Sequence, residues 1–158
     1  MEQLATGVDV IELSRVRQAL DRHGERFLRR IYTPAELTFC RGRLSELAAR
    51  FAAKEATMKA LGTGVRGVGW REIEVMPNRR GKPMLNLYGR ARARAEAIGL
   101  QGLDVSLTHS REYAAAVVVG LRTHRVPEED RPLTAEEVAE RRRRVLEERR
   151  RRAAGGAG

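Results

Sequence analysis

The chain has 158 residues, 42% of them hydrophobic and only 4% aromatic, so we expect one ordinary domain with a core of aliphatic side chains. The formal net charge is +10, and nearly all of it lies in residues 1–125, because residues 126–158 hold nine arginines against eight acidic residues; the partner of the folded body should be anionic. One cysteine, Cys40, excludes a disulfide framework, and without a membrane-spanning run or a signal-peptide pattern we expect a cytoplasmic protein.

The N-terminal half is predicted to be mostly helical. Residues 7–13 form a Val- and Ile-rich strand, Ser14 is the expected N-cap of a helix that ends before Gly24, and a short helix covers residues 26–31. Thr33-Pro34-Ala35-Glu36 has the pattern of a helix start with a capping box. The clearest helix spans residues 44–61, and a loop over residues 64–69 follows it.

The second half alternates strands and helix. We predict strands over residues 70–76 and 83–87, a helix over 89–98, and strands over 103–108 and 113–121. Helices packed on antiparallel strands give an α+β fold. Residues 126–158 form a charged tail that is either disordered or a solvated helix, so the folded domain should be residues 1–125.

Two acidic side chains fall on faces that the hydrophobic pattern assigns to the core. Strand alternation puts Asp9 on the same side as Ile11, and Glu55 falls within the apolar stripe that contains Phe51 and Met58. A buried, ionised carboxylate is costly unless a positive charge compensates it. Two of them from separate elements indicate a hard cation such as Mg²⁺, although each could instead pair with one of the many arginines.

Lysines and a glycine turn surround this predicted carboxylate pair. Lys54 precedes Glu55, Lys59 follows it by one helical turn, and Gly62-Thr63-Gly64 ends the helix. A metal-binding acid, lysines and a glycine turn together predict a pyrophosphate site. The alternative for Lys54 is an exposed position on the helix surface.

These segments resemble the motifs of the phosphopantetheinyl transferases. The run Phe51-Ala52-Ala53-Lys54-Glu55-Ala56, continuing to Lys59-Ala60, is similar to the family's signature, and Gly7-Val8-Asp9-Val10-Ile11-Glu12 is similar to its metal-binding strand. Three further motifs follow in order: Gly81-Lys82-Pro83, Ser106-Leu107-Thr108-His109-Ser110 and Glu112-Tyr113-Ala114-Ala115-Ala116. The spacing of the first two motifs and the short chain indicate the small bacterial carrier-protein synthase branch.

The resemblance implies roles for individual residues. Asp9 and Glu55 would bind magnesium, together with the pyrophosphate of coenzyme A. Phosphate contacts would come from Lys59, with Arg50, Lys54, Gly62 and Gly64 as further candidates. His109 would lie near the 3'-phosphate of the nucleotide, unless it is a structural turn residue.

The implied reaction transfers the 4'-phosphopantetheine group of coenzyme A to a serine of apo acyl carrier protein and releases 3',5'-ADP, in support of fatty acid or polyketide synthesis. Glu55, or a water that it orients, would be the general base, and Lys59 would offset charge on the pyrophosphate. The family's small members are homotrimers with active sites between subunits. The first strand and the long helix of one chain are therefore not required to share a site.

Acyl carrier proteins are strongly acidic, and residues 14–30 of this chain hold six arginines. Arg15 and Arg22 lie seven positions apart and share a helix face, so we expect them to dock the carrier protein. The alternative is an ordinary solvated face.

Two other functions stay open. A nucleic-acid-binding module would use the basic body, but the low aromatic content and the lack of a recognition motif disfavour it, and we expect neither a nucleic acid nor a membrane as partner. A metal-dependent phosphohydrolase would use the same two acids and would release 3',5'-ADP without modifying a carrier protein.

Overall fold

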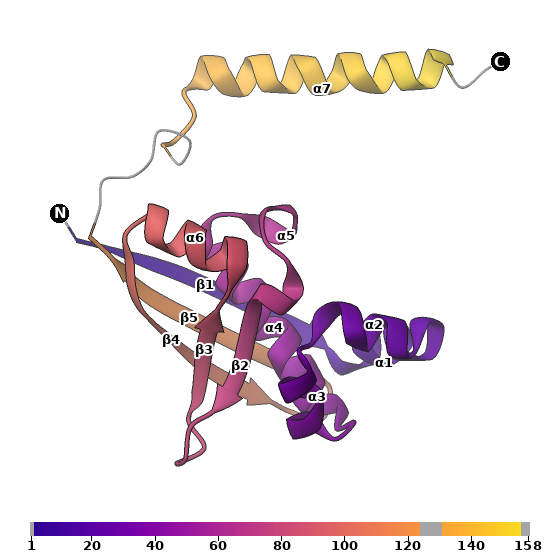
Figure 1. The fold of residues 1–158 in the computed structure, drawn as a ribbon. Helices are drawn as coiled ribbons and strands as arrows, with labels where there is room; N and C mark the ends of the chain where they lie inside the picture. The colour runs from indigo at the N-terminus through magenta and orange to yellow at the C-terminus, as the bar shows by residue number, and fades with distance from the viewer. Residues whose placement is uncertain (1, 124–130, 156–158) are drawn as a thin grey trace. The chain divides into compact units, whose positions relative to one another are not determined.

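The computed structural model describes residues 2–123 and 131–155 of the chain. The chain divides into two compact units, one reaching residue 125 and the other beginning at residue 126. The larger unit has the predicted α+β fold, and the described part of the smaller unit contains one helix, α7 (Ala135–Gly155) (Figure 1).

Along the chain, the elements of the larger unit are β1 (Gln3–Glu12), α1 (Leu13–His23), α2 (Glu25–Ile31), α3 (Pro34–Cys40), α4 (Leu44–Leu61), α5 (Gly64–Gly67), the 3-10 helix η1 (Trp70–Glu72), β2 (Ile73–Pro77), β3 (Pro83–Leu87), α6 (Gly89–Ala97), β4 (Leu100–His109) and β5 (Tyr113–Arg122). Three long strands form an antiparallel sheet in the order β1-β5-β4, and β2 pairs with β3 in a separate two-stranded sheet. None of the described helices combines the length and the hydropathy needed to cross a bilayer.

The long helix α4 is the centre of the core. It packs along β1 and β5, and twelve of its 18 residues are buried, six of them alanines. Small side chains let the neighbouring elements approach the helix from most sides, so α4 is not amphipathic in the usual sense. Its boundaries agree with the sequence prediction, and Gly62 ends it in the left-handed conformation with φ of 71°.

Several predicted boundaries are wrong. β1 begins at Gln3 because it stays in register with β5 over its whole length, from Gln3 opposite Arg122 to Glu12 opposite Tyr113. Ser14 is not the N-cap of α1, since the helix begins at Leu13 and Glu12 is the cap residue. The predicted strand over residues 70–76 begins with the 3-10 helix η1, and the predicted loop over residues 64–69 contains α5.

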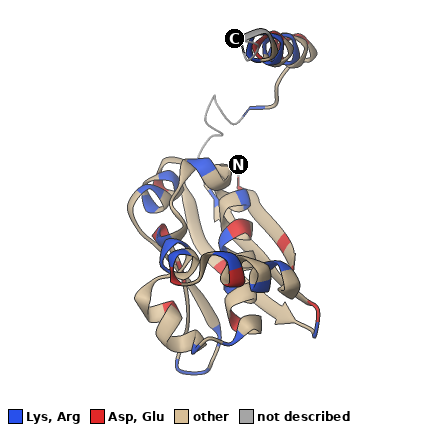
Figure 2. Ribbon diagram, turned by 90° about the vertical axis from the view of Figure 1, so that its right-hand side faces the viewer, with Lys and Arg blue, Asp and Glu red and all other residues tan. Residues whose placement is uncertain are grey.

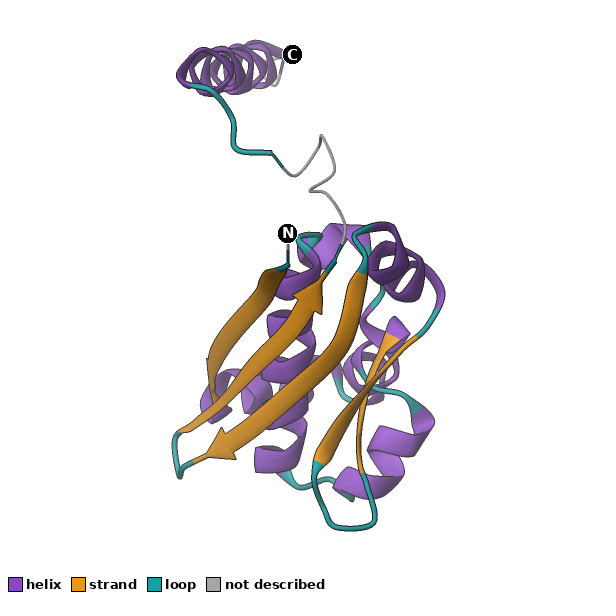
Figure 3. Cartoon of the chain, turned by 90° about the vertical axis from the view of Figure 1, so that its left-hand side faces the viewer, coloured by secondary structure: helices purple, strands orange, loops and turns teal. Residues whose placement is uncertain are grey.

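The helices of the larger unit cover one face of the three-stranded sheet, and the other face is left open by them (Figure 3). Five large apolar side chains of β1 and β5 point outward from that open face and are exposed by 39–66%: Leu4, Val8, Val10, Val117 and Val119. Lys and Arg gather on the helices and on the turn between β2 and β3, while the strands are mostly free of them (Figure 2). The open sheet face is therefore apolar along β1 and β5 and poor in basic residues, and Asp104 on β4 is an exposed acid of this face.

Candidate active site

Asp9 and Glu55 lie close together within one chain. Local structure sets the orientation of both side chains. Asp9 and Ile11 both point to the covered side of β1, and Glu55 is on the side of α4 that faces this strand. Gly7 allows the close approach, because a Cβ at this position would lie 1.8 Å from the carbonyl oxygen of Ala56. The predicted inward orientation of Asp9 is confirmed, with only 12% of its side chain exposed.

Lys59 completes this cluster one helical turn beyond Glu55. Its Nζ donates to the Val8 carbonyl oxygen at 2.7 Å and lies 3.0 Å from Oδ1 of Asp9. The Lys59 side chain is 53% exposed, so its ammonium can reach an anion in solvent without a rearrangement of the core. We call Asp9, Glu55 and Lys59 the carboxylate cluster.

The two acids disfavour each other's charge. Burial, followed by the neighbouring Asp9 carboxylate, raises the pKa of Glu55 above its ordinary value, while Lys59 and Arg15 act in the opposite direction. The described residues contain no group of three or more His, Cys, Asp and Glu side chains placed to hold a metal. A pair of carboxylates still fits Mg²⁺, which typically binds one or two of them and completes its shell with water and phosphate oxygens.

A cavity of about 280 Å³ opens from the carboxylate cluster between β1, α1, α2 and α4. Its polar end is formed by Asp9, Glu55 and Arg15, and the remainder is apolar, including Phe27 and Phe51. Phe51 stacks on Trp70 with ring centroids 4.8 Å apart, which fixes this wall of the cavity to the core. We call this space the carboxylate pocket.

A second pocket of about 480 Å³ lies between α4, the β2–β3 turn and β4, and none of its lining residues lines the carboxylate pocket. Its polar groups come from Ser106, His109 and two ion pairs, Arg50 with Glu46 and Lys82 with Asp104 at 2.8 Å. The Arg50 guanidinium lies 2.6 Å from Glu46 and 4.3 Å from the ring centroid of Phe39, so it is held in place. We call this space the α4–β4 pocket.

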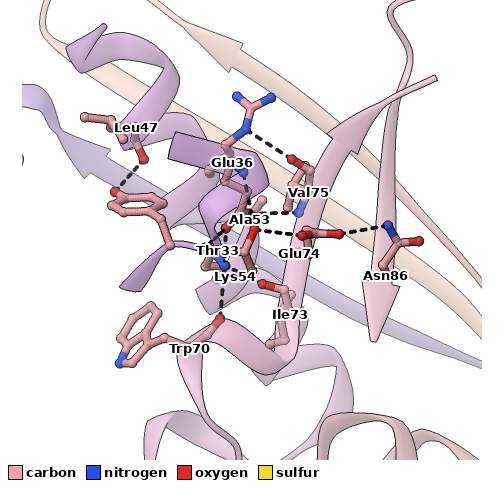
Figure 4. A network of polar contacts seen from close by, with 12 residues as sticks. Thr33, Glu36, Leu47, Ala53, Lys54, Trp70, Ile73, Glu74, Val75 and Asn86 are labelled. Carbon is pink, nitrogen blue, oxygen red and sulfur yellow. Dashed lines mark hydrogen bonds and ion pairs between the residues drawn. The ribbon is translucent and has the colours of Figure 1, made fainter. Parts of the chain in front are cut away.

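Lys54 belongs to the core, so neither an exposed position nor a phosphate contact fits this structure. Its side chain is fully buried, and its Nζ lies 2.8 Å from the Glu36 carboxylate and donates to the carbonyl oxygens of Trp70 and Ile73. Figure 4 shows these contacts converging on Lys54. Glu36 in turn accepts from the backbone N–H groups of Thr33 and Val75. With all three ammonium hydrogens engaged by protein, we leave Lys54 out of the ligand set.

Among the other predicted residues, Gly62 and Gly64 have φ of 71° and 58° and carry the chain out of α4, while His109 is exposed at the end of β4. Arg15 lines the carboxylate pocket, although the sequence suggested only a docking role; Arg22 is exposed in the last turn of α1. Lys82, within the motif Gly81-Lys82-Pro83, also lines a pocket, although the sequence predicted no role for it.

Comparison with known proteins agrees with the family that the motifs predict. Residues 5–118 match the family model of the 4'-phosphopantetheinyl transferase superfamily. A holo-[acyl-carrier-protein] synthase of Herpetosiphon aurantiacus is 50% identical over 125 residues, which cover 75% of this chain and 98% of that protein. One from Dehalococcoides mccartyi is 52% identical over 116 residues, covering 73% and 97%.

Solved structures give the same result. The Helicobacter pylori holo-[acyl-carrier-protein] synthase in complex with coenzyme A superposes with a TM-score of 0.67 at 28% identity, over 73% of this chain and 98% of that one. The Bacillus anthracis enzyme in complex with CoA (3',5'-ADP) gives 0.61 at 37% identity, over 75% and 96%.

The chain belongs to the 4'-phosphopantetheinyl transferase superfamily. Its relatives within that superfamily are holo-[acyl-carrier-protein] synthases, so the family predicted from the motifs is confirmed.

Proposed function

We propose that this protein transfers the 4'-phosphopantetheine group of coenzyme A to a serine of apo acyl carrier protein and releases 3',5'-ADP, with Mg²⁺ as cofactor. The observation that carries this proposal is the carboxylate cluster, where two acids and a half-exposed lysine meet at the mouth of a cavity. The Helicobacter pylori and Bacillus anthracis relatives bind coenzyme A, which supports it as the donor. The single cysteine is buried and free, which suits a cytoplasmic enzyme.

In this mechanism, Asp9 and Glu55 would hold Mg²⁺, which would supply positive charge to the pyrophosphate of coenzyme A. Lys59 leaves Asp9 and binds a phosphate oxygen, so that positive charge lies where negative charge develops. Glu55, or a water that it orients, accepts the proton of the carrier serine. The serine oxygen then bonds to the β-phosphorus as the bond between that phosphorus and the oxygen bridging to 3',5'-ADP breaks.

We propose that the nucleotide end of coenzyme A binds the α4–β4 pocket, where the exposed Lys82 and His109 offer contacts for the 3'-phosphate. Arg50 is only 2% exposed and is paired with Glu46, so it forms part of the wall and does not contact the phosphate. Since α4 separates this pocket from the carboxylate pocket, one coenzyme A would use pockets of two neighbouring subunits. The open apolar face of the three-stranded sheet supports self-association, and we propose a homotrimer.

We propose that α1 docks the carrier protein. Arg15 on this helix lines the carboxylate pocket, so a carrier bound along α1 brings its serine near Glu55. Arg22 lies outside that pocket and is exposed, so a substitution there tests carrier docking without altering the pocket. Arg22→Glu should raise the carrier KM by about three- to tenfold and leave coenzyme A binding unchanged.

The experiment that tests the proposed function measures 3',5'-ADP release with and without apo carrier protein, in the presence of coenzyme A and Mg²⁺. A transferase releases it only with the carrier, in equal amount to the modified carrier. Release without carrier would identify a phosphohydrolase instead, and salt-sensitive nucleic-acid binding without coenzyme A binding would favour a nucleic-acid-binding module.

A further inference from the structure

Helix α7 lies outside the part of the chain that carries the family's chemistry. The family model matches residues 5–118, and about three quarters of this chain already covers 97–98% of the length of two relatives. The basal reaction of those relatives therefore proceeds without a counterpart of this helix. Any role of α7 should add to the reaction, for example as a contact with a partner.

The start of α7 is fixed by side chains just before the helix and in its first turn. The backbone N–H of Thr134 donates to Glu137 at 2.7 Å, and the backbone N–H of Glu137 donates back to the Thr134 hydroxyl at 3.3 Å. Arg131 forms an ion pair with the same glutamate. This reciprocal capping favours a helix, and its 21 residues exceed the length below which an isolated helix is marginal.

The charges of α7 are segregated around the helix. The helix holds eight arginines and five glutamates. On one side, glutamates stand four residues before arginines, and Glu140 and Arg144 form an ion pair. The pair Glu147 and Arg151 has the same spacing.

The opposite side combines arginine with exposed valine. Val138, Arg142, Val145 and Arg149 are spaced by four, three and four residues, so they form one stripe along the helix. Neither Arg142 nor Arg149 has an acidic residue three or four positions away. Val138 and Val145 are exposed by 50% and 45%, and Leu146 beside them by 50%. We call Val138, Arg142, Val145 and Arg149 the valine–arginine stripe.

The composition of the stripe selects among anionic partners. A membrane surface is disfavoured because the described part of this unit has no aromatic residue, and its apolar side chains are valines, alanines, two leucines and one proline. A nucleic acid backbone would pair with the arginines but would leave the valines between them facing phosphates. A protein helix with acidic side chains flanking an apolar line matches both components.

We propose that the valine–arginine stripe is a second docking surface for the acidic carrier protein. The proposal rests on the proposed function for the identity of that partner. Two arginines without acidic neighbours pair with carboxylates of the carrier, and the valines pack against its apolar side chains. Because α7 is covalently attached to the enzyme, this contact adds to the one on α1 by raising the effective concentration of the carrier.

The test compares two full-length variants with the same change in charge. Arg142→Gln/Arg149→Gln alters the stripe, and the control Arg144→Gln/Arg151→Gln alters the other side of the helix. The stripe variant should raise the carrier KM by about three- to tenfold, since each exposed ion pair contributes up to about 1 kcal/mol. Its kcat and its KM for coenzyme A should match wild type, and the control should match wild type in all three. Circular dichroism of both variants checks that the helix is retained.

Equal increases in carrier KM for both variants would show that net charge alone matters, and no increase in either would show that α7 does not contact the carrier. Either result overturns the proposal, as would stripe-dependent binding of tRNA or of anionic phosphatidylserine vesicles with an unchanged carrier KM. Direct titration of apo carrier protein by fluorescence anisotropy tests the stripe even if the enzyme shows no transfer. If the wild-type protein binds the carrier through the stripe without modifying it, this result would contradict the proposed function but would support the docking surface.

Discussion

The buried pair between Lys54 and Glu36 should contribute strongly to the stability of this fold. Lys54→Met keeps an unbranched side chain, one heavy atom shorter, and removes its charge. It leaves the Glu36 carboxylate buried without a counter-charge, and it leaves the carbonyl oxygens of Trp70 and Ile73 without their donor. Breaking a buried pair from one side typically costs about 3–5 kcal/mol of unfolding free energy, and we expect a loss of that size.

The matched control is Lys59→Met, which makes the same substitution five residues further along α4. Lys59 is 53% exposed, so the loss of its ion pair should cost about 0–1 kcal/mol. Urea denaturation followed by the fluorescence of Trp70, at a fixed protein concentration, gives both free energies. Glu36→Gln and the double variant complete a cycle in which the two single losses should not add, because the second change removes the charge that the first one stranded.

A Lys54→Met variant as stable as Lys59→Met would refute this account of the core. If its stability held while its affinity for coenzyme A fell, Lys54 would be a phosphate contact after all. The predicted result is the reverse, with stability lost from Lys54→Met and phosphate affinity lost from Lys59→Met.

Other predictions concern the site and the assembly. Gly7→Ala should push β1 away from α4 and lower both transfer and stability, the latter by about 1–3 kcal/mol, as measured by turnover and urea denaturation. Asp9→Asn and Glu55→Gln should each lower kcat about a hundredfold or more, and EDTA should abolish activity until Mg²⁺ is restored; near-normal turnover of either variant at saturating Mg²⁺ contradicts the metal assignment. Deletion of residues 126–158 should leave a homotrimer by light scattering, and a monomer would contradict the proposed interface. Burial raises the pKa of the Cys40 thiol to about 11, so alkylation of the folded protein at pH 8 should be about a hundredfold slower than in urea and should accelerate as the pH approaches 11.

The sequence predicted those parts of the fold that depend on local pattern. The boundaries of α4, the capping box at Thr33 and the inward side of Asp9 all follow from spacing along one element. The burial of Lys54 could not be predicted in this way, because its partner Glu36 lies on another helix and because α4 is enclosed on most sides. An apolar stripe marks only one buried face, whereas the contacts around α4 were set by tertiary packing.

The same distinction holds for the site. Asp9 and Glu55 could be found because each is an acid in an apolar pattern, and the structure brings them together within one chain. Lys82 and His109 line one pocket only because β3 and β4 pack near α4, which no spacing in the sequence reveals. Arg15 has the pattern of an exposed helix residue, and its place at the carboxylate pocket depends on the angle between α1 and β1.

The central claim is the transfer of phosphopantetheine to a carrier serine, and intact-mass spectrometry of the carrier tests it most directly. Apo acyl carrier protein is incubated with this enzyme, coenzyme A and Mg²⁺, beside a carrier in which the acceptor serine is replaced by alanine. We predict a gain of about 340 Da on the serine carrier, the mass of the transferred arm, and none on the alanine carrier. An unchanged mass of the serine carrier, with coenzyme A intact or hydrolysed, would contradict the account.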